Sequence, residues 1–248
     1  MSAPLDSTLV STVDNYWATF LGCEPSALRS STVQIAVHSG PGDHLKCHLM
    51  EFGGAPVVSL PANELALYRD AIAEWRDGVV LTSALIKAVF GERAAAILGP
   101  AFVGYTDSKR FPRIPGGKAR PLIPGDRKAF DRLRTACPVE EWESGGNDFQ
   151  PSSMIGVFER GRLAALASYE LWDDRIAHIY IVSHPLLRGR GYAATAVSAL
   201  TKIVFERGLV PQYRTLEANK PSMAVARRLG FVQYATSFAV RLSSLKSS

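Results

Sequence analysis

The sequence predicts a mixed α/β (α+β) fold, in which a small first domain precedes a domain whose mostly antiparallel sheet is flanked by helices. Three observations support this prediction. Apolar and β-branched residues alternate over short runs in both halves of the chain, which is typical of half-buried strands. Other stretches repeat apolar residues at three and four positions, which is typical of amphipathic helices. A segment rich in proline and glycine separates the two halves.

The separating segment, residues 109–124, holds four prolines and two adjacent glycines. Neither a helix nor a central strand can run through it, because proline lacks the amide hydrogen that both need. We therefore expect a first domain at 1–108, a linker at 109–119 and a second domain at 120–248. A chain of 248 residues with 47% hydrophobic content is long enough for two small domains.

In the first domain, three β-branched runs predict strands and three amphipathic runs predict helices. The Gly-Gly pair at 53–54 joins the second and third strands as a hairpin. The strands are expected at residues 32–37, 45–52 and 56–60, and the helices at 8–21, 63–75 and 82–98.

The second domain shows a more definite pattern. A short strand and a helix that begins at the cap-like Asp126 lead into a second short helix and a three-strand meander. A long helix that stops at Gly208, a strand, a helix with Pro221 in its first turn, and two final strands follow. The strands are expected at residues 120–123, 154–159, 162–172, 175–183, 210–217, 231–234 and 237–242, and the helices at 126–136, 138–143, 193–204 and 221–230.

Charge and cysteine content narrow the function classes. Residues 1–119 carry 10 Lys and Arg against 11 Asp and Glu, whereas residues 120–248 carry 18 against 12. The basic excess of the second half suits an anionic ligand, either nucleic acid or a phosphorylated cofactor.

Three widely spaced cysteines argue against a disulfide framework and a zinc ribbon. His44, Cys47 and His48 lie close in sequence, but a strand points neighbouring side chains to opposite faces, so we expect no metal.

The most informative stretch runs from Ile179 to Ala193, where an apolar strand passes through a proline turn into a glycine-rich helix start. Free amide groups at a helix N-terminus attract anions, and the helix dipole adds positive potential there. Gly189 and Gly191 allow the backbone to approach a pyrophosphate, while Arg188 and Arg190 supply charge.

Two spaced motifs carry a family resemblance. Arg188-x-x-Gly191-x-Ala193 resembles the Arg/Gln-x-x-Gly-x-Gly/Ala signature of the GNAT superfamily of N-acetyltransferases. Further on, Asn219-Lys-Pro-Ser222 precedes a terminal Gly-Phe pair at 230–231, which resembles the second hallmark of that family. The resemblance covers roughly residues 118–244, and the flanking elements follow the order found in the family.

The resemblance implies an acetyl-CoA-dependent N-acetyltransferase that needs no metal and no protein nucleophile. In the family, two neighbouring strands splay apart, and their free backbone groups hold the pantetheine arm and the thioester carbonyl. The implied cofactor contacts are Ile181, Val182, Ser183, Arg188, Gly189, Arg190, Gly191, Tyr192, Ala193, Asn219 and Ser222. A backbone amide in the gap would stabilise the oxyanion of the tetrahedral intermediate.

Several residues are candidates for proton transfer. Many members of the family place a tyrosine seven positions after the hallmark Asn, but here that position is Ala226. Tyr180, Tyr192 or solvent could protonate the departing thiolate instead. Glu170 and Glu217 are equal candidates for the base that deprotonates the amine, and each could instead be an edge carboxylate paired with an arginine.

The acceptor is expected to be an amine, either a small molecule or a protein amino group, and the acidic residues Glu141 and Glu143 with Trp142 are candidates for binding it. A non-catalytic acyl-CoA-binding module is the alternative function. No interleaved stripe of basic and aromatic residues predicts specific nucleic-acid binding.

No apolar run reaches the length of a membrane span and no leader is evident, so we expect a cytoplasmic protein. Three roles stay open for the first domain: a cover for the acceptor site, a homodimer contact, or a degenerate copy of the same fold.

Overall fold

A computed structural model describes residues 4–39, 45–112, 114 and 119–244. The chain forms two compact units, and each draws on segments that are distant in sequence. Unit one comprises Met1–Val103, Thr215–Met223 and Gln233–Ser248, and unit two comprises Gly104–Arg214 and Ala224–Val232. The division into domains at residues 109–119 stays a prediction, because these units record spatial proximity and not independent folding.

Among the described residues, the strands of unit one lie in the order β1-β3-β2-β10-β4. The C-terminal strand β10 pairs antiparallel with β2, so that Val240 lies opposite Cys47. The β2–β3 hairpin expected from its Gly-Gly turn is confirmed. The elements are α1 (Ser7–Leu21), β1 (Gln34–His38), β2 (Lys46–Glu51), β3 (Val57–Pro61), α2 (Leu65–Ala73), α3 (Ser83–Phe90), β4 (Ala94–Tyr105) and β10 (Val232–Leu242).

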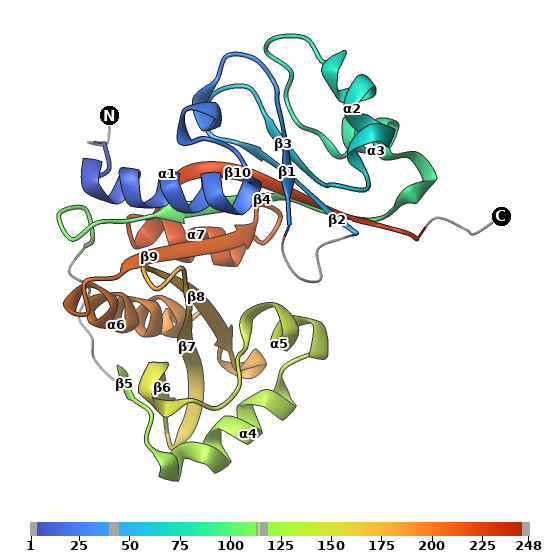
Figure 1. Cartoon of the computed structure of the whole chain (residues 1–248). Helices are drawn as coiled ribbons and strands as arrows, with labels where there is room; N and C mark the ends of the chain where they lie inside the picture. Colours follow the sequence, from blue (N-terminus) through green and yellow to red (C-terminus); the bar gives the residue numbers. More distant parts are fainter. Residues whose placement is uncertain (1–3, 40–44, 113, 115–118, 245–248) are drawn as a thin grey trace. The chain divides into compact units, whose positions relative to one another are not determined.

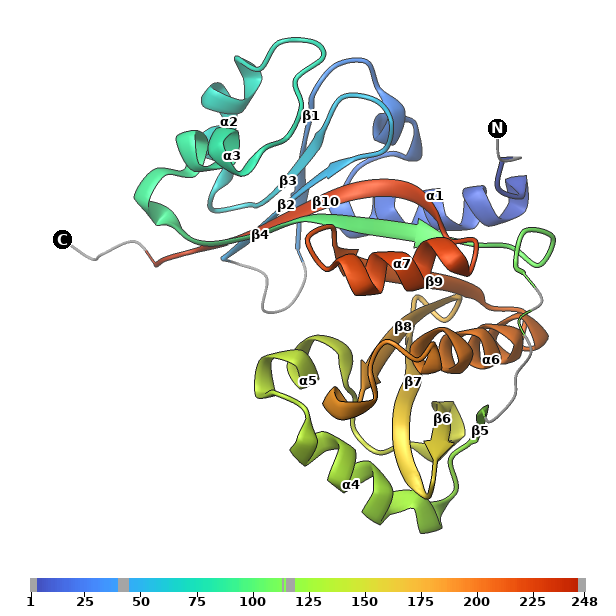
Figure 2. The same cartoon turned by 180° about the vertical axis from the view of Figure 1, so that it is seen from behind.

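The sheet of unit one lies between α1 on one face and α2 with α3 on the other (Figures 1 and 2). Alternation along the strands explains this arrangement, because successive side chains point to opposite faces. On β3, Ser59 bonds the end of α1, whereas Val58 and Leu60 join the core beneath α2 and α3. Asp6 caps the N-terminus of α1, because its carboxylate accepts from the amide of Thr8 at 3.0 Å.

Unit two contains the strand order β9-β8-β7-β6-β5. The meander of β6, β7 and β8 is antiparallel, as expected, and β9 joins β8 in parallel. The elements are β5 (Ala119–Pro121), α4 (Arg127–Ala136), α5 (Val139–Gly145), β6 (Met154–Glu159), β7 (Arg162–Trp172), β8 (Ile176–Ser183), α6 (Tyr192–Glu206), β9 (Val210–Leu216) and α7 (Lys220–Arg228). The last residues of β9 and the first of α7 belong to unit one.

Helix α6 covers one face of the meander, and α4 and α5 cover part of the opposite face (Figures 1 and 2). Leu166 of β7 and Val182 of β8 join Phe130 and Leu133 of α4 in one buried cluster. Further along the same face of these strands, the even-numbered positions carry Ser168, Glu170, His178 and Tyr180. This face therefore changes from apolar to polar along its length.

The fold class is confirmed, and three local predictions are wrong. The helix expected at 82–98 ends at Phe90, because Gly91 adopts a φ of 56° that ends a helix. Residues 94–98 open the strand β4 instead, although alanine favours helices, because strand pairing overrides local propensity. The two strands expected at 231–234 and 237–242 are one continuous strand, β10.

Within the described ranges, no helix combines the length and the apolar character that crossing a membrane requires.

Candidate functional site

Strand β8 loses one of its neighbours halfway along. It pairs with β7 over its whole length, from Ile176 to Ser183. Its parallel pairing with β9 stops at the pair formed by Ile179 and Tyr213. Residues 180–183 therefore have β7 on one side and, among the described residues, no ladder partner from β9 on the other. Backbone groups that point toward the missing neighbour are available to a ligand, except that the carbonyl of Ser183 already accepts from Cys137 Sγ at 3.8 Å and from Arg188 Nη2 at 3.5 Å.

The glycine-rich turn follows directly. Gly189 and Gly191 adopt φ angles of 76° and 79°, a conformation that side chains other than glycine rarely take. Gly191 precedes the first residue of α6, Tyr192, and has no side chain to cap the amides of the first turn. These amides and the helix dipole make the turn suitable for a phosphate group.

Two arginines, Arg188 and Arg228, lie beside this turn. Arg188, predicted to bind the pyrophosphate, forms an ion pair with Glu141, predicted to bind the acceptor. Both side chains are about half exposed, at 45% and 47%, so the pair is easily exchanged for another partner. The guanidinium of Arg228, from α7, lies 3.8 Å from where a Cβ on Gly191 would be. Sequence reasoning missed Arg228, although it stands two residues before the hallmark glycine.

Helix α5 carries the predicted acceptor residues and approaches β8 closely. A Cβ on Gly145 would lie 2.6 Å from the carbonyl oxygen of Ile181. Trp142 is half-buried and packs edge-on against Phe130, with ring centroids 5.3 Å apart. Glu143 is exposed. The structure thus places α5 beside the unpaired part of β8, while the acceptor role of its residues stays a prediction.

Glu170 and Tyr180 come together on the face of the meander opposite α6. The phenol of Tyr180 donates a hydrogen bond to Glu170 Oε2 at 2.9 Å. Burial, followed by this bond to a carboxylate, raises the pKa of Tyr180 well above its usual value. Tyr180 is therefore a protonated donor at any physiological pH, and Glu170 is exposed beside it.

His178 lies on the same face and is buried. Its ring stacks on Trp172, with centroids 4.1 Å apart and an interplanar angle of 10°. Its Nδ1 lies 2.9 Å from Gln212 Oε1, and the amide nitrogen of Gln212 donates to the hydroxyl of Tyr105. Burial lowers the pKa of His178 to about 4, so the ring is neutral at pH 7.

Three of the predicted residues, Glu217, Asn219 and Ser222, belong to unit one. Asn219 caps α7, because its Oδ1 accepts from the amide of Ser222 at 3.2 Å. Glu217 lies near Glu51, whose pKa is raised first by burial and then by the charge of Glu217, against the lowering effect of the Leu81 amide. Their roles as base and cofactor contacts stay predictions.

Tyr192 and Ala226 bear on how the departing thiolate is protonated. Tyr192 donates to Glu159 Oε2 at 3.0 Å, which holds its hydroxyl against β6. Ala226, at the position where many members of the family carry a tyrosine, is fully buried. Ala226 offers no acid, so Tyr180 and Tyr192 remain the candidate side chains for protonating the thiolate.

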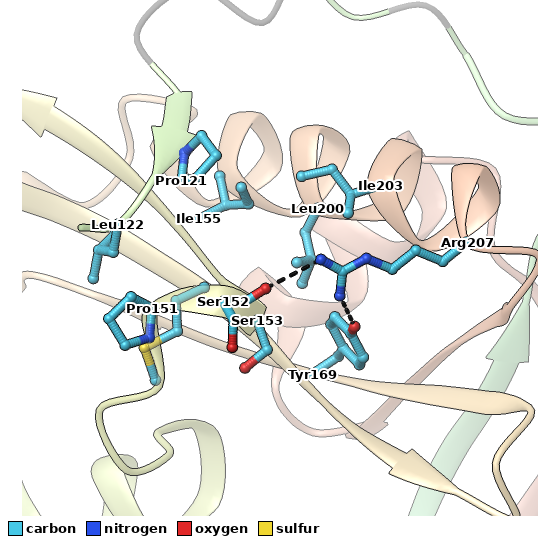
Figure 3. Close-up of a pocket in the computed structure, with 11 residues that line it drawn as sticks. Pro121, Leu122, Pro151, Ser152, Ser153, Ile155, Tyr169, Leu200, Ile203 and Arg207 are labelled. Carbon is cyan, nitrogen blue, oxygen red and sulfur yellow. Dashed lines mark hydrogen bonds between the residues drawn. The ribbon is translucent and has the colours of Figure 1, made fainter. Parts of the chain in front are cut away.

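A separate hollow of about 200 Å³ lies beside the C-terminal half of α6 (Figure 3). Apolar side chains from β5, β6 and α6 line it. The guanidinium of Arg207 bonds the hydroxyl of Tyr169 and the carbonyl of Ser152, so its charge is already engaged. None of the predicted site residues lines this hollow.

The described residues contain no group of three or more His, Cys, Asp or Glu that could hold a metal ion. His44, one of the three residues weighed as a ligand, lies outside them. Burial raises the pKa of the Cys47 thiol to about 12, so it is protonated at neutral pH, whereas metals bind the thiolate.

Comparison with known proteins confirms the family resemblance. Residues 124–231 match the model of the acetyltransferase (GNAT) family. No curated protein matches the sequence. Among solved structures, a GNAT-family acetyltransferase from Colwellia psychrerythraea aligns at 18% identity and a TM-score of 0.50, over 64% of this chain and 61% of that one. This match shows a shared fold, and it spans less than two thirds of the Colwellia protein.

Two other solved structures align with lower TM-scores. A GNAT-family protein from Novosphingobium aromaticivorans aligns at 22% identity and a TM-score of 0.47, over 61% of this chain and 68% of that one. The protein yncA from Salmonella typhimurium, solved with acetyl-CoA, aligns at 14% identity and a TM-score of 0.39, over 52% of this chain and 96% of that one.

Proposed function

We propose, from the match of residues 124–231 to the acetyltransferase (GNAT) family model, that the protein transfers the acetyl group of acetyl-CoA to an amine. One observation carries the proposal. The point where β8 separates from β9, after Ile179 and Tyr213, is followed within ten residues by the glycine-rich turn before α6. Along the chain, a strand that is unpaired on one side is followed by an anion-binding turn. In the cofactor, the pantetheine arm is likewise followed by the pyrophosphate, so the strand suits the arm and the turn suits the pyrophosphate.

In this proposal, the turn before α6 and the end of β8 hold the cofactor. The amides at Gly191, Tyr192 and Ala193 face the pyrophosphate, and Arg190 adds charge from the exposed turn. Arg188 exchanges Glu141 for the pyrophosphate when the cofactor binds, which frees the carboxylate. The backbone of residues 181–183 bonds the amides of the arm. One backbone amide in the gap stabilises the oxyanion, an interaction worth about 3 kcal/mol of the activation barrier.

Proton removal is assigned to Glu170 acting through Tyr180. A bound ammonium group donates its proton to the Tyr180 oxygen as the phenolic proton passes to Glu170. The neutral amine then attacks the thioester carbonyl and forms the C–N bond, and the tetrahedral intermediate collapses with loss of the CoA thiolate. The proton held by Glu170 returns through Tyr180 to the thiolate, so Tyr180 remains protonated overall. The attacking nitrogen, which keeps two protons after the C–N bond forms, releases one of them to solvent and becomes the neutral amide.

The test is calorimetric titration with acetyl-CoA, with thiol release in the presence of amines as the readout of turnover. Gly191→Glu puts a carboxylate where the pyrophosphate is expected, and Arg188→Ala removes a cation. Gly208→Glu is the matched control, because Gly208 has a similar φ of 70° at the other end of α6 and its substitution meets no neighbour within 4 Å. We expect micromolar binding that Gly191→Glu abolishes and Gly208→Glu preserves. Equal losses in both variants would contradict the assignment of the turn.

A non-catalytic acyl-CoA-binding module is the second candidate, and the buried Ala226 in place of the family tyrosine favours it. Both candidates predict acetyl-CoA binding, and turnover distinguishes them. Binding without thiol release for any of a panel of primary amines, arylamines and peptides would support the binding module. Thiol release that depends on the amine and on Glu170 would exclude it.

A further inference from the structure

Three polar side chains form a buried chain where β8 and β9 are last paired. His178 and Gln212 are opposite each other in the parallel ladder, one pair before it ends. Gln212 and Tyr105 are fully buried, and His178 is 9% exposed. Because Gln212 Oε1 accepts from His178 Nδ1, this nitrogen carries the proton, and the Gln212 amide then donates to Tyr105.

Such a chain is costly unless each member is bonded. A buried amide or imidazole without a partner loses about 1–3 kcal/mol relative to its hydrated state. The bonds are therefore made only when β8 and β9 keep the register that puts His178 opposite Gln212. A purely apolar pair would tolerate small shifts, whereas a directional hydrogen bond fixes the distance between the strands.

We propose that His178, Gln212 and Tyr105 form a brace that fixes where β8 and β9 separate, and thereby positions residues 180–183, the part of β8 beyond the last pair with β9, for the pantetheine arm. This inference rests on the proposed function of the same gap. His178 is a positioning residue in this scheme. Its protonated nitrogen is used inside the protein, and the ring is held between Trp172 and Tyr180.

Three variants separate the brace from bulk packing. His178→Phe keeps a flat ring against Trp172 but removes the donor, and Gln212→Met keeps the volume but removes both partners. His178→Asn restores a donor near the Nδ1 position. The control is Ser198→Ala, which alters a buried hydroxyl of α6 that has no hydrogen-bond partner in the described structure.

The first readout needs no ligand. Exchange of the amide hydrogens at residues 176–179, 210, 212 and 213 should quicken roughly tenfold in His178→Phe and Gln212→Met and stay near wild type in His178→Asn and Ser198→Ala. Exchange that is unchanged in both of the first two variants would overturn the brace.

The second readout compares two ligands by calorimetry. CoA carries the pantetheine arm, whereas adenosine 3′,5′-bisphosphate lacks it. We expect His178→Phe to weaken CoA binding about tenfold and bisphosphate binding less than about twofold. The reason is that the variant loses the hydrogen bond to Gln212 that holds β8 in register beside the pantetheine arm. Equal losses for both ligands would overturn the inference.

A pH profile of kcat/KM tests the alternative of a catalytic histidine, with Glu170 and Arg214 as the charged groups that act on the ring. Loss of the acidic limb in His178→Phe would make His178 a base and overturn its positioning role. If the wild type binds neither ligand, the proposed function fails, and the exchange experiment alone decides whether the brace exists.

Discussion

Each unit buries a histidine on a strand, and the two histidines differ in what surrounds them. In unit one, His38 Nδ1 lies 2.8 Å from Ser59 Oγ, which donates to the carbonyl of Leu21 at 2.6 Å. In unit two, His178 Nδ1 lies 2.9 Å from Gln212 Oε1. Both rings bond a neutral side chain and are less than 10% exposed.

The surrounding pairing separates the two cases. Strand β1 keeps its partner β3 through His38 to its end, and the bond chain closes on a helix carbonyl. Strand β8 loses β9 one pair after His178. The same hydrogen-bond chemistry thus closes a core in unit one and stands beside an open strand edge in unit two. We infer that the pairing around a buried polar group, more than the group itself, distinguishes a structural role from a functional one.

The largest effect on stability is expected at another closed polar group of unit one, the pair of Arg93 and Glu64. Glu64 is 1% exposed and accepts from Arg93 Nη2 at 2.9 Å. Arg93→Leu leaves this carboxylate buried and unpaired, which should lower the free energy of unfolding by about 3–5 kcal/mol. Urea denaturation measures it.

Arg127→Leu is the control, because its pair with Asp131 is exposed on both sides and should contribute less than about 0.5 kcal/mol. If Arg93→Leu lowered the free energy of unfolding by no more than Arg127→Leu, the buried carboxylate of Glu64 would not depend on Arg93 for its stability.

The pH dependence of stability should reveal His178. Its folded pKa, about 4, lies below the usual 6.5, so the unfolded state binds the proton more tightly. Its contribution to stability is therefore complete above pH 6.5 and is lost as the pH falls toward 4, by on the order of 3 kcal/mol. Unfolding of the wild type and His178→Phe between pH 4 and 7.5 tests this, and parallel curves would contradict the shift.

The proton path in unit two should affect rate and not stability. Glu170→Gln removes the proposed final proton acceptor and should lower kcat roughly 100-fold, the low end for general base catalysis. Tyr180→Phe should behave similarly. KM for acetyl-CoA should change less than about twofold, because neither side chain is assigned to the cofactor. Glu206→Gln, an exposed carboxylate of α6, is the control, and unchanged kcat in Glu170→Gln would move the base elsewhere.

Most of the fold could be predicted from the sequence, because apolar residues recur at helical or strand spacing along most of the helices and strands. The meander from Met154 to Ser183 and the glycine-rich start of α6 depend on contiguous residues, so both were visible in the sequence. Strand β4 was missed because its alanine-rich beginning favours a helix until distant strands pair with it. Two separate strands with Ala235 and Thr236 between them were predicted, yet both residues continue the single strand β10.

The candidate site could be predicted from the sequence where its residues are neighbours in the chain, and its long-range contacts could not. The turn at residues 188–193 forms one motif. Gln212 and Tyr105 are 107 positions apart, and nothing in the sequence indicates that they share a hydrogen bond. Arg188 and Glu141 were assigned to different ligands, although they are paired across 47 positions. Such partners are fixed by topology, which periodicity does not reveal.

The smallest effect is expected where the comparison began, at Ser59. Ser59→Ala removes the acceptor of His38 Nδ1 and the donor to Leu21, and should lower the free energy of unfolding by about 1–2 kcal/mol. Ser198→Ala deletes a buried hydroxyl with no hydrogen-bond partner in the described structure, and should cost less than about 0.5 kcal/mol. Neither variant should change CoA affinity. If Ser59→Ala weakened CoA binding as much as His178→Phe, closed pairing would not mark a structural role, and the distinction between the two histidines would fail.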